Sequence, residues 1–299
     1  MNFRQLEYIL AVNEQGHFGR AAEQCFISQA TLSEMIKKLE EELGIIIFDR
    51  SRSPVILTSQ GTDVIKNARD IIDKTHELKQ LKSSLEGRLS GTLRIGVIPT
   101  VAPILLPTII KPFVSAYPDI NLKIKEATTD QLISDLEANQ LDGAILATPV
   151  ANTDMNEYPL YTEALKVYGI NDKTKELVNI QDVKNNKIWL LQEGHCLKDQ
   201  VVSICEIDEK SFEIDGLEIE CNSFATLVGL VDDFGGYTLL PEHYVKIMSK
   251  YRQLKTRSFE EPEPKRQISM LVFRPFVKKL QINALVNVIR KQINLKEKK

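Results

Sequence analysis

Residues 18–44 read FGRAAEQCFISQATLSEMIKKLEEELG, and this stretch decides the fold of the first part of the chain. Its paired alanines, Ala21 and Ala22, are small enough for another helix to pack closely. Ser28 is a typical N-cap, and Gly44 is a typical left-handed residue at the end of a helix. The stretch therefore predicts a short helix, a tight turn, and a second helix between Ser28 and Gly44.

The second helix has an apolar face and a polar face. Its apolar positions follow helical spacing, at Leu32, Ile36, Leu39 and Leu43. A second helix with short polar and basic side chains at its start is typical of a helix-turn-helix that enters the major groove of DNA. Gln pairs bidentately with adenine, whereas Ser and Thr suit several base edges or phosphates. The predicted DNA contacts of this helix are Ser28, Gln29, Thr31, Ser33, Lys37 and Lys38.

The flanking residues extend this arrangement. Residues 3–14 carry apolar side chains at helical spacing, which predicts a first helix. The segments IIIFDRS (45–51) and SPVILTS (53–59) predict a two-stranded wing, with Arg50 and Arg52 at its tip to contact phosphates or a minor groove. The alternative is an ordinary three-helix packing unit with a solvated face, and the wing argues against it.

A long helix is predicted from Ser59 to about Glu86. Its seam has 4-3 spacing, at Val64, Ala68, Ile71, Thr75, Leu78, Lys82 and Leu85. Such a seam is typical of a dimerising coil, and dimers suit operators with two half-sites. The alternative is a helix that packs on its own domain.

At this point the sequence resembles a known family. Residues 3–61, with their AA pair, SQ, LE and LG segments and final LTSQG, resemble the winged helix-turn-helix of LysR-type transcriptional regulators. Ala30 stands where that family usually has Pro, and the difference should cost little because the residue lies in the first helical turn. The resemblance implies a regulator that binds double-stranded promoter DNA as a homodimer or homotetramer and acts on RNA polymerase.

The remaining residues alternate predicted strands and helices, which favours an α/β unit with a largely parallel sheet. Two such runs resemble the two-lobed, periplasmic-binding-protein-like effector domain of the same family. We expect an all-α winged helix-turn-helix over 1–58 and a linker helix and hinge over 59–90. We expect a regulatory domain over 91–299, with lobe I about 91–163 and 267–299 and lobe II about 164–266. Ligands of such sheets bind where strands end, which selects residues 98–100, 127–129 and 192–196.

The four cysteines, at 25, 196, 205 and 221, lack the CxxC pairs of a zinc site and are few for a disulfide framework. Cys196 is predicted in the first turn of a helix, where the helix dipole, His195 and Lys198 favour a thiolate. If the segment is helical, Cys205 is about 13.5 Å further along, so a disulfide requires local unwinding. Packed core cysteines, a redox pair and a metal site all remain open on spacing alone.

Three segments resemble the hydrogen-peroxide-sensing members of the LysR-type family: GVIPTVAPILLP (96–107), EGHCLKDQ (193–200) with a second cysteine nine positions after the first, and PEPKRQISMLVFRP (262–275). The resemblance implies that Cys196 is the peroxidatic cysteine and Cys205 the resolving one. It places Thr100, Thr129 and His195 near the peroxide. Lys198 stands where Arg is common, and Asp199 matches a polar residue that pairs with that charge. Cys25 and Cys221 are expected to be structural.

Composition adds limits to these expectations. The net charge is −3, and residues 1–90 carry 12 Lys+Arg against 13 Asp+Glu, so the charge totals neither favour nor exclude DNA binding. No run of eighteen apolar residues and no secretory signal occurs, so a cytoplasmic protein without a membrane partner is expected. We predict a protein that is not an enzyme and has no cofactor or metal site, and we expect glutaredoxin or thioredoxin to act as reductant. The rivals are a LysR-type regulator that binds a small-molecule effector between the lobes, and a thiol peroxidase with a vestigial DNA-binding head.

Overall fold

The computed structural model describes residues 1–51, 54–85, 89–150, 155–170, 176–184, 186–191, 219, 221, 223–273 and 278–297. The chain divides into two compact units, an N-terminal unit, Met1–Gly91, and a C-terminal unit, Thr92–Lys299. No helix in the described ranges has both the length and the apolar character needed to cross a membrane.

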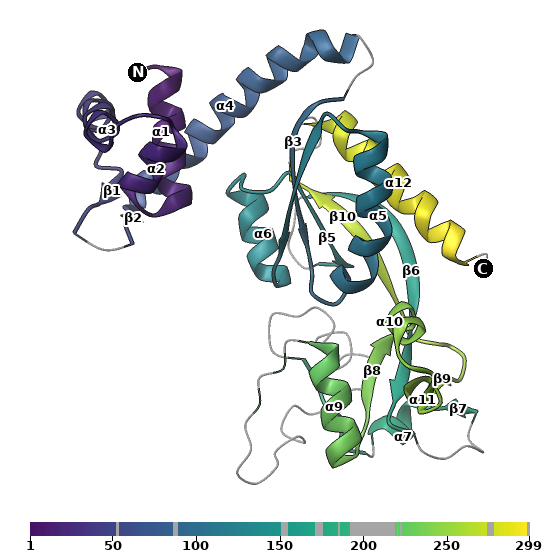
Figure 1. Cartoon of the computed structure of the whole chain (residues 1–299). Helices are drawn as coiled ribbons and strands as arrows, with labels where there is room; N and C mark the ends of the chain where they lie inside the picture. The colour runs from purple at the N-terminus through teal and green to yellow at the C-terminus, as the bar shows by residue number, and fades with distance from the viewer. Residues whose placement is uncertain are drawn as a thin grey trace. The chain divides into compact units, whose positions relative to one another are not determined.

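The N-terminal unit is a winged helix-turn-helix followed by a long helix (Figure 1). Its elements are α1 (Phe3–Gln15), α2 (Phe18–Gln24), α3 (Gln29–Leu43), β1 (Phe48–Asp49), β2 (Ile56–Leu57) and α4 (Ser59–Leu85). The Ser28 hydroxyl caps α3 by accepting from the backbone N–H of Thr31 at 3.1 Å. Gly44 ends α3 with a φ of 66°, as predicted from its place in the sequence.

Part of the seam predicted along α4 is buried in the core of this unit. Ala68 is buried and Val64 is packed against the helix-turn-helix core, because α4 lies against α1. The alternative of a helix packed on its own domain is therefore right for this part of α4. Further along, Ile71 is 38% exposed and Leu78 is 69% exposed, so an apolar surface continues where the packing ends.

The C-terminal unit alternates strands and helices as predicted. Its strands are β3 (Gly91–Val97), β4 (Ile120–Glu126), β5 (Gly143–Thr148), β6 (Asn156–Tyr168), β7 (Leu177–Val178), β8 (Thr238–Pro241), β9 (Thr256–Phe259) and β10 (Lys265–Val272). Its helices are α5 (Ala102–Ala116), α6 (Thr129–Glu137), α7 (Ile180–Lys184), α9 (Phe224–Phe234), α10 (Glu242–Ile247), α11 (Lys250–Gln253) and α12 (Lys279–Glu297). Helices α5 and α12 cover one side of the part of the sheet formed by β4, β3, β5 and β10, and α6 lies on the other side (Figure 1).

The sheet is mixed, which corrects the expectation of a largely parallel one. Strands β3 and β5 pair in parallel, but β10 is antiparallel to both of its neighbours, β5 and β6. The strand β6 serves two sets of partners along its length. Residues 156–164 pair with β10, and residues 165–168 pair with β8, again antiparallel.

A second apolar core surrounds the later part of β6. It includes Leu165, Val167 and Cys221, together with the inner face of α9. The helix expected to begin near Cys196 falls in residues 192–218, outside the described residues. The strand expected over 219–223 is described only in part, and the strand expected at 187–192 forms a single bridge between Ile188 and Tyr237 in the described residues.

Candidate functional sites

The first candidate site is the exposed start of α3. Gln29 and Thr31 are exposed on its first turn, while Ser28 and Thr31 also bond to each other through their hydroxyl oxygens at 2.8 Å. Ser28 therefore has a capping role in addition to its predicted contact with DNA. Among the described residues, the side-chain cap of α3 is Ser28 and not Gln29.

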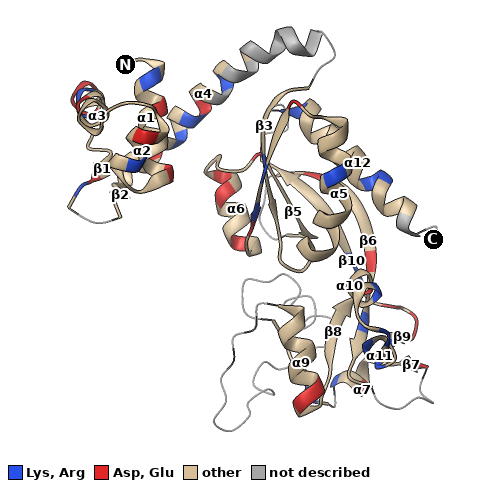
Figure 2. Ribbon diagram, viewed as in Figure 1, with Lys and Arg blue, Asp and Glu red and all other residues tan. Residues whose placement is uncertain are grey.

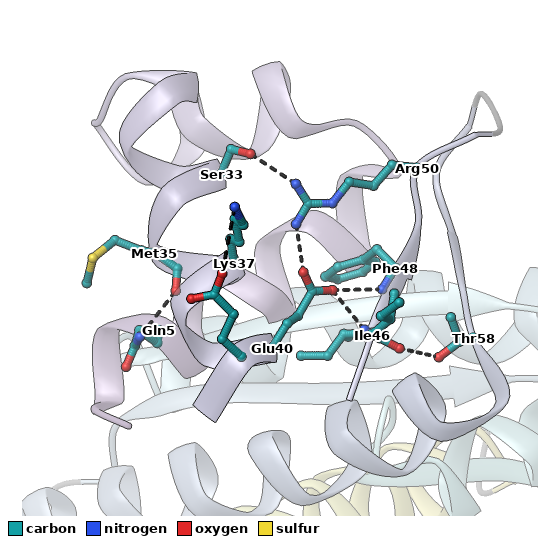
Figure 3. A network of polar contacts seen from close by, with 11 residues as sticks. Gln5, Ser33, Met35, Lys37, Glu40, Ile46, Phe48, Arg50 and Thr58 are labelled. Atoms are coloured by element: carbon teal, nitrogen blue, oxygen red, sulfur yellow. Dashed lines mark hydrogen bonds and ion pairs between the residues drawn. The ribbon is translucent and has the colours of Figure 1, made fainter. Parts of the chain in front are cut away.

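The wing arginine Arg50 is held against α3 (Figure 3). Its guanidinium donates to Ser33 Oγ at 3.1 Å and to Glu40 Oε2 at 2.8 Å, and its Cζ lies 4.9 Å from the centre of the Phe18 ring. The other Glu40 oxygen, Oε1, accepts the backbone N–H of Ile47 at 2.8 Å. One carboxylate therefore joins α3, β1 and the wing arginine.

The lysines of α3 are exposed and have acidic neighbours. Lys38 lies 2.7 Å from Glu34, and Lys37 lies 3.7 Å from Glu41, each one helical turn apart. Figure 2 shows basic and acidic residues interspersed on the N-terminal helices. Exposed ion pairs of this kind are weak, so the lysines can exchange their carboxylates for phosphates at little cost. Arg52 lies outside the described residues.

The second candidate site lies where β3 and β4 end in the C-terminal unit. The backbone N–H of Ala127 donates to the carbonyl of Val97 at 3.3 Å, which joins the loops that follow the two strands. Thr100 and Thr129 follow these strand ends and are 3% and 6% exposed. The structure thus places both predicted threonines at the same edge of the sheet.

The two threonine hydroxyls differ in their partners. Thr129 Oγ1 is buried and has no hydrogen-bond partner among the described residues. Thr100 Oγ1 accepts from Arg266 Nη1 at 3.1 Å, and its carbonyl accepts from Arg266 Nη2 at 3.3 Å. Because Arg266 donates to the hydroxyl oxygen of Thr100, the hydrogen of that hydroxyl can donate to another group.

Arg266 is a buried cation, only 1% exposed, and Glu163 neutralises it. Glu163 Oε1 accepts from Arg266 Nε at 2.9 Å and lies 2.8 Å from Nη2. Burial by itself raises the pKa of Glu163, but the charge of Arg266 and a hydrogen bond from His243 hold that pKa below its ordinary value. The carboxylate is therefore ionised and acts only as an acceptor.

His243 completes this network from α10. Its Nδ1 lies 2.8 Å from Glu163 Oε2, and its ring meets the Tyr161 ring edge to face at a centroid distance of 5.3 Å. Since Glu163 accepts only, Nδ1 must carry the hydrogen. Burial raises the pKa of Tyr161, so this phenol stays neutral beside the network.

The sequence contained a signal for Arg266 and Glu163 that its motifs alone did not reveal. Arg266 is buried between the exposed Lys265 and the half-buried Gln267, and Ile268 is buried two positions further on, so the arginine occupies an inward-facing position of β10. Glu163 follows the exposed Thr162 on β6 and is itself buried. A charged residue at an inward position of a strand needs a partner, and this indicates a site.

The predicted redox residues, Cys196 and Cys205, lie outside the described residues, as do His195, Lys198 and Asp199. The two described cysteines, Cys25 and Cys221, are free. Burial raises the pKa of both thiols, and the charge of Glu7 adds to the effect at Cys25, so neither favours the reactive thiolate. Among the described residues, no group of three His, Cys, Asp or Glu side chains is placed to hold a metal ion.

A winged helix-turn-helix joined by a long helix to an α/β unit defines a class of bacterial DNA-binding regulators, and the comparisons with known proteins agree. Residues 3–62 match the bacterial regulatory helix-turn-helix protein, lysR family, and residues 86–294 match the LysR substrate binding domain. The chain belongs to the LysR family. It is thus a DNA-binding regulator, as predicted, and not a member of an enzyme family.

Particular relatives narrow this further. A hydrogen peroxide-inducible genes activator of Dickeya chrysanthemi is 37% identical over 278 residues, which cover 92% of this chain and 90% of that protein. A full-length OxyR variant from Pseudomonas aeruginosa superposes with a TM-score of 0.82 at 31% identity, over 97% of this chain and 98% of that one. An H2O2-bound cysteine-to-serine mutant of Corynebacterium glutamicum OxyR gives a TM-score of 0.63 at 27% identity, over 98% and 92% of the two chains.

Proposed function

We propose that this protein is a transcriptional regulator that senses hydrogen peroxide by forming a reversible disulfide between Cys196 and Cys205. The observation that carries the proposal is the pair of buried hydroxyls at the edge of the sheet. Thr129 has an unpartnered hydroxyl among the described residues, and Thr100 has a hydroxyl hydrogen that Arg266 leaves free to donate. A buried unpartnered hydroxyl is costly, so Thr129, beside a Thr100 hydroxyl that can still donate, supports a small polar ligand such as peroxide.

The relatives support the same ligand. The Dickeya protein is named as a hydrogen peroxide-inducible genes activator. The Corynebacterium OxyR structure has H2O2 bound. In this chain a predicted strand end is followed by His195, Cys196, Lys198 and Asp199. Thr100 and Thr129 likewise follow the ends of observed strands. Ligands of α/β sheets bind at such ends.

The proposed chemistry has two steps. The Cys196 thiolate attacks one peroxide oxygen, an S–O bond forms, and the O–O bond breaks. The departing hydroxide takes a proton and leaves as water, assisted by donors such as the Thr100 hydroxyl. Cys205 then attacks the sulfenic sulfur of Cys196, a second water leaves, and a disulfide forms.

The oxidised protein returns to the reduced state through a dithiol. Glutaredoxin or thioredoxin supplies two electrons, reduces the disulfide to two thiols, and is itself oxidised to a disulfide. Neither step uses a metal or an organic cofactor. These reductants are found in the cytoplasm, where glutathione keeps thiols reduced, and we propose that the protein acts there.

The N-terminal unit supplies the readout. We propose that residues 1–58 bind promoter DNA, residues 59–90 dimerise, and residues 91–299 sense peroxide, in a homodimer or homotetramer that acts on RNA polymerase. Gln29 and Thr31 face solvent at the start of α3, which supports their contact with bases. Lys37, Lys38 and the wing arginines supply phosphate contacts.

The test is peptide mapping by mass spectrometry after one equivalent of hydrogen peroxide is added to the reduced protein. A linked Cys196–Cys205 peptide is expected in the wild type and should be absent from Cys196→Ser. The same variant should bind DNA but lose the change in footprint that peroxide causes in the wild type. Wild-type protein without this disulfide would contradict the proposal, and continuous peroxide turnover with reductant would indicate a thiol peroxidase instead.

A further inference from the structure

His243 is a buried residue that a chain of hydrogen bonds links to Thr100 through two other side chains. It lies on α10, which contacts β6 and α5, and is 7% exposed. Its Nδ1 bonds to Glu163, Glu163 bonds to Arg266, and Arg266 bonds to Thr100. These contacts form a continuous chain of four side chains from a helix to the loop after β3.

We propose that His243 is a positioning residue for the reaction with peroxide, because its Nδ1–H fixes the carboxylate that orients Arg266 against Thr100. This inference rests on the proposed function and adds a residue to it. A side chain that acts through others lowers the reaction rate when removed, because it lets the donors of the site rotate away from their productive directions.

The two carboxylate oxygens of Glu163 have different partners, and this explains how His243 can affect the orientation of Arg266. Oε1 receives both contacts from Arg266, at 2.9 and 2.8 Å, and Oε2 receives only the histidine among the contacts given by the described residues. Without the histidine, this contact of Oε2 is lost, and the carboxylate is free to turn a different oxygen toward Arg266. The guanidinium is planar and rigid, so a rotation at one edge moves the other edge, which donates to Thr100.

The geometry also predicts which substitution rescues the function. The amide nitrogen of asparagine is attached at the same position along the side chain as Nδ1 of histidine, whereas the amide nitrogen of glutamine is one bond further out. His243→Asn should therefore keep the donor to Glu163, and His243→Gln should misplace it. The control on the same helix is Lys246→Ala, since Lys246 is exposed and pairs with Glu242 and not with the network.

The experiment measures the second-order rate constant for disulfide formation at limiting hydrogen peroxide, in the full-length protein. His243→Gln should slow oxidation about tenfold, whereas His243→Asn and Lys246→Ala should stay within about twofold of the wild type. The rate of Cys196 alkylation by iodoacetamide should be the same in all four proteins, because the network orients peroxide and does not ionise the thiol. A general structural defect would change alkylation as well.

The outcomes separate this inference from the function on which it rests. If the wild type forms no Cys196–Cys205 disulfide, the proposed function fails. If the wild type reacts and His243→Gln reacts equally fast, only the role of His243 is overturned. Equal slowing of the two His243 variants, or a parallel loss of alkylation, would also overturn it.

Discussion

Thr129 shows how a single side chain can point to a ligand through its cost in stability. Its hydroxyl is buried and lacks a partner among the described residues, and a group of this kind destabilises a protein by about 1 to 3 kcal/mol. Thr148 is also buried, but its hydroxyl donates to Glu157 at 2.7 Å. The two buried threonine hydroxyls therefore differ in whether the fold supplies a partner.

This contrast gives a prediction for Thr129→Val. The free energy of unfolding should rise by about 1 kcal/mol, because valine has the same shape and removes the unpartnered hydroxyl. Oxidation by peroxide should slow, because a hydrogen bond to the ligand is lost. Denaturant titration and stopped-flow oxidation measure the two effects.

Thr148→Val is the matched control. It removes a satisfied hydroxyl and leaves Glu157 with one donor fewer, so it should lower the free energy of unfolding by about 1 to 2 kcal/mol. A loss of stability in Thr129→Val as large as that in the control would show that the Thr129 hydroxyl is bonded after all.

At the scale of elements, the Glu40 carboxylate makes most of the polar contacts between α3 and the wing, and the hydrogen bond from Arg50 to Ser33 adds one more. Glu40 accepts the backbone N–H groups of Ile47 and Phe48 through Oε1, and it pairs with Arg50 through Oε2. The two wing strands are only two residues long, so their own ladder contributes little. The position of the wing therefore depends on this side chain.

We predict that Glu40→Ala lowers the free energy of unfolding of the N-terminal unit by about 2 kcal/mol, because it leaves backbone donors without their acceptor. Operator affinity should fall as well, because Arg50 loses its partner. Glu40→Gln should retain most of the stability, since its amide oxygen can still accept. Thermal unfolding and a DNA titration provide the measurements.

The control for this prediction is Glu41→Ala. Glu41 has the same charge on the same helix, but it is exposed and pairs only weakly with Lys37. An effect on stability equal to that of Glu40→Ala would mean that net charge, and not the wing contact, is responsible.

The later part of α4 presents apolar side chains without cover within the N-terminal unit. Leu78 and Ile71 follow the predicted seam and stay exposed, whereas Ala68 is buried in the core of the unit. A partly exposed helical seam of this kind fits a partner helix. The dimer contact is thus expected over the later part of α4 only.

Leu78→Ser should raise the dimer dissociation constant by about thirtyfold or more, since about 1 to 2 kcal/mol of apolar burial is lost at each of two symmetric positions. Sedimentation equilibrium measures the constant. Lys66→Ser, at an exposed position of α4 away from the seam, is the control. An unchanged constant in Leu78→Ser would place the dimer contact elsewhere.

At the scale of the whole C-terminal unit, buried ion pairs join segments that are distant in sequence. Asp142 accepts from the backbone and guanidinium of Arg94 and from Lys278 at 2.9 Å. Burial raises the pKa of Asp142, but Arg94 and Lys278 together hold it below its ordinary value. The pKa of Glu163, which lies on β6 and pairs with Arg266 of β10, is shifted in the same direction.

The pH dependence follows from the sign of these shifts. A carboxyl group with a lowered pKa in the folded state stabilises the fold above its unfolded pKa of about 4, and the stabilisation is lost as pH falls through the lower folded value. We therefore expect these groups to contribute fully at pH 7 and the free energy of unfolding to fall below about pH 4. Denaturant titrations across this range measure it.

Asp142→Asn should cost about 3 kcal/mol at pH 7, because it leaves two cations without a counter-charge, and should flatten the acid dependence. Asp119→Asn, at an exposed position of the same unit, should change neither quantity. The same acid slope in Asp142→Asn and the wild type would assign the effect to other carboxyl groups.

The elements of the N-terminal unit were predictable because their signals are local. Ser28 caps, Gly44 stops, and periodic apolar residues define helices whose ends match the structure. The shared location of Thr100 and Thr129 was also predictable, since both follow strands in motifs that resemble the family. The limits of β6 were not, because a long strand that changes partners partway leaves no mark in its own periodicity.

The sequence by itself determined the class of the protein, the helix-turn-helix and the candidate residues for a peroxide site. Only the tertiary structure decided that Arg266, Glu163 and His243 form one network with Thr100, and that part of α4 is buried in its own unit. The physical reason is range. Caps and helical periodicity act over a few residues, whereas this network joins residues as far apart as 100 and 266, and their contact depends on how the strands pair.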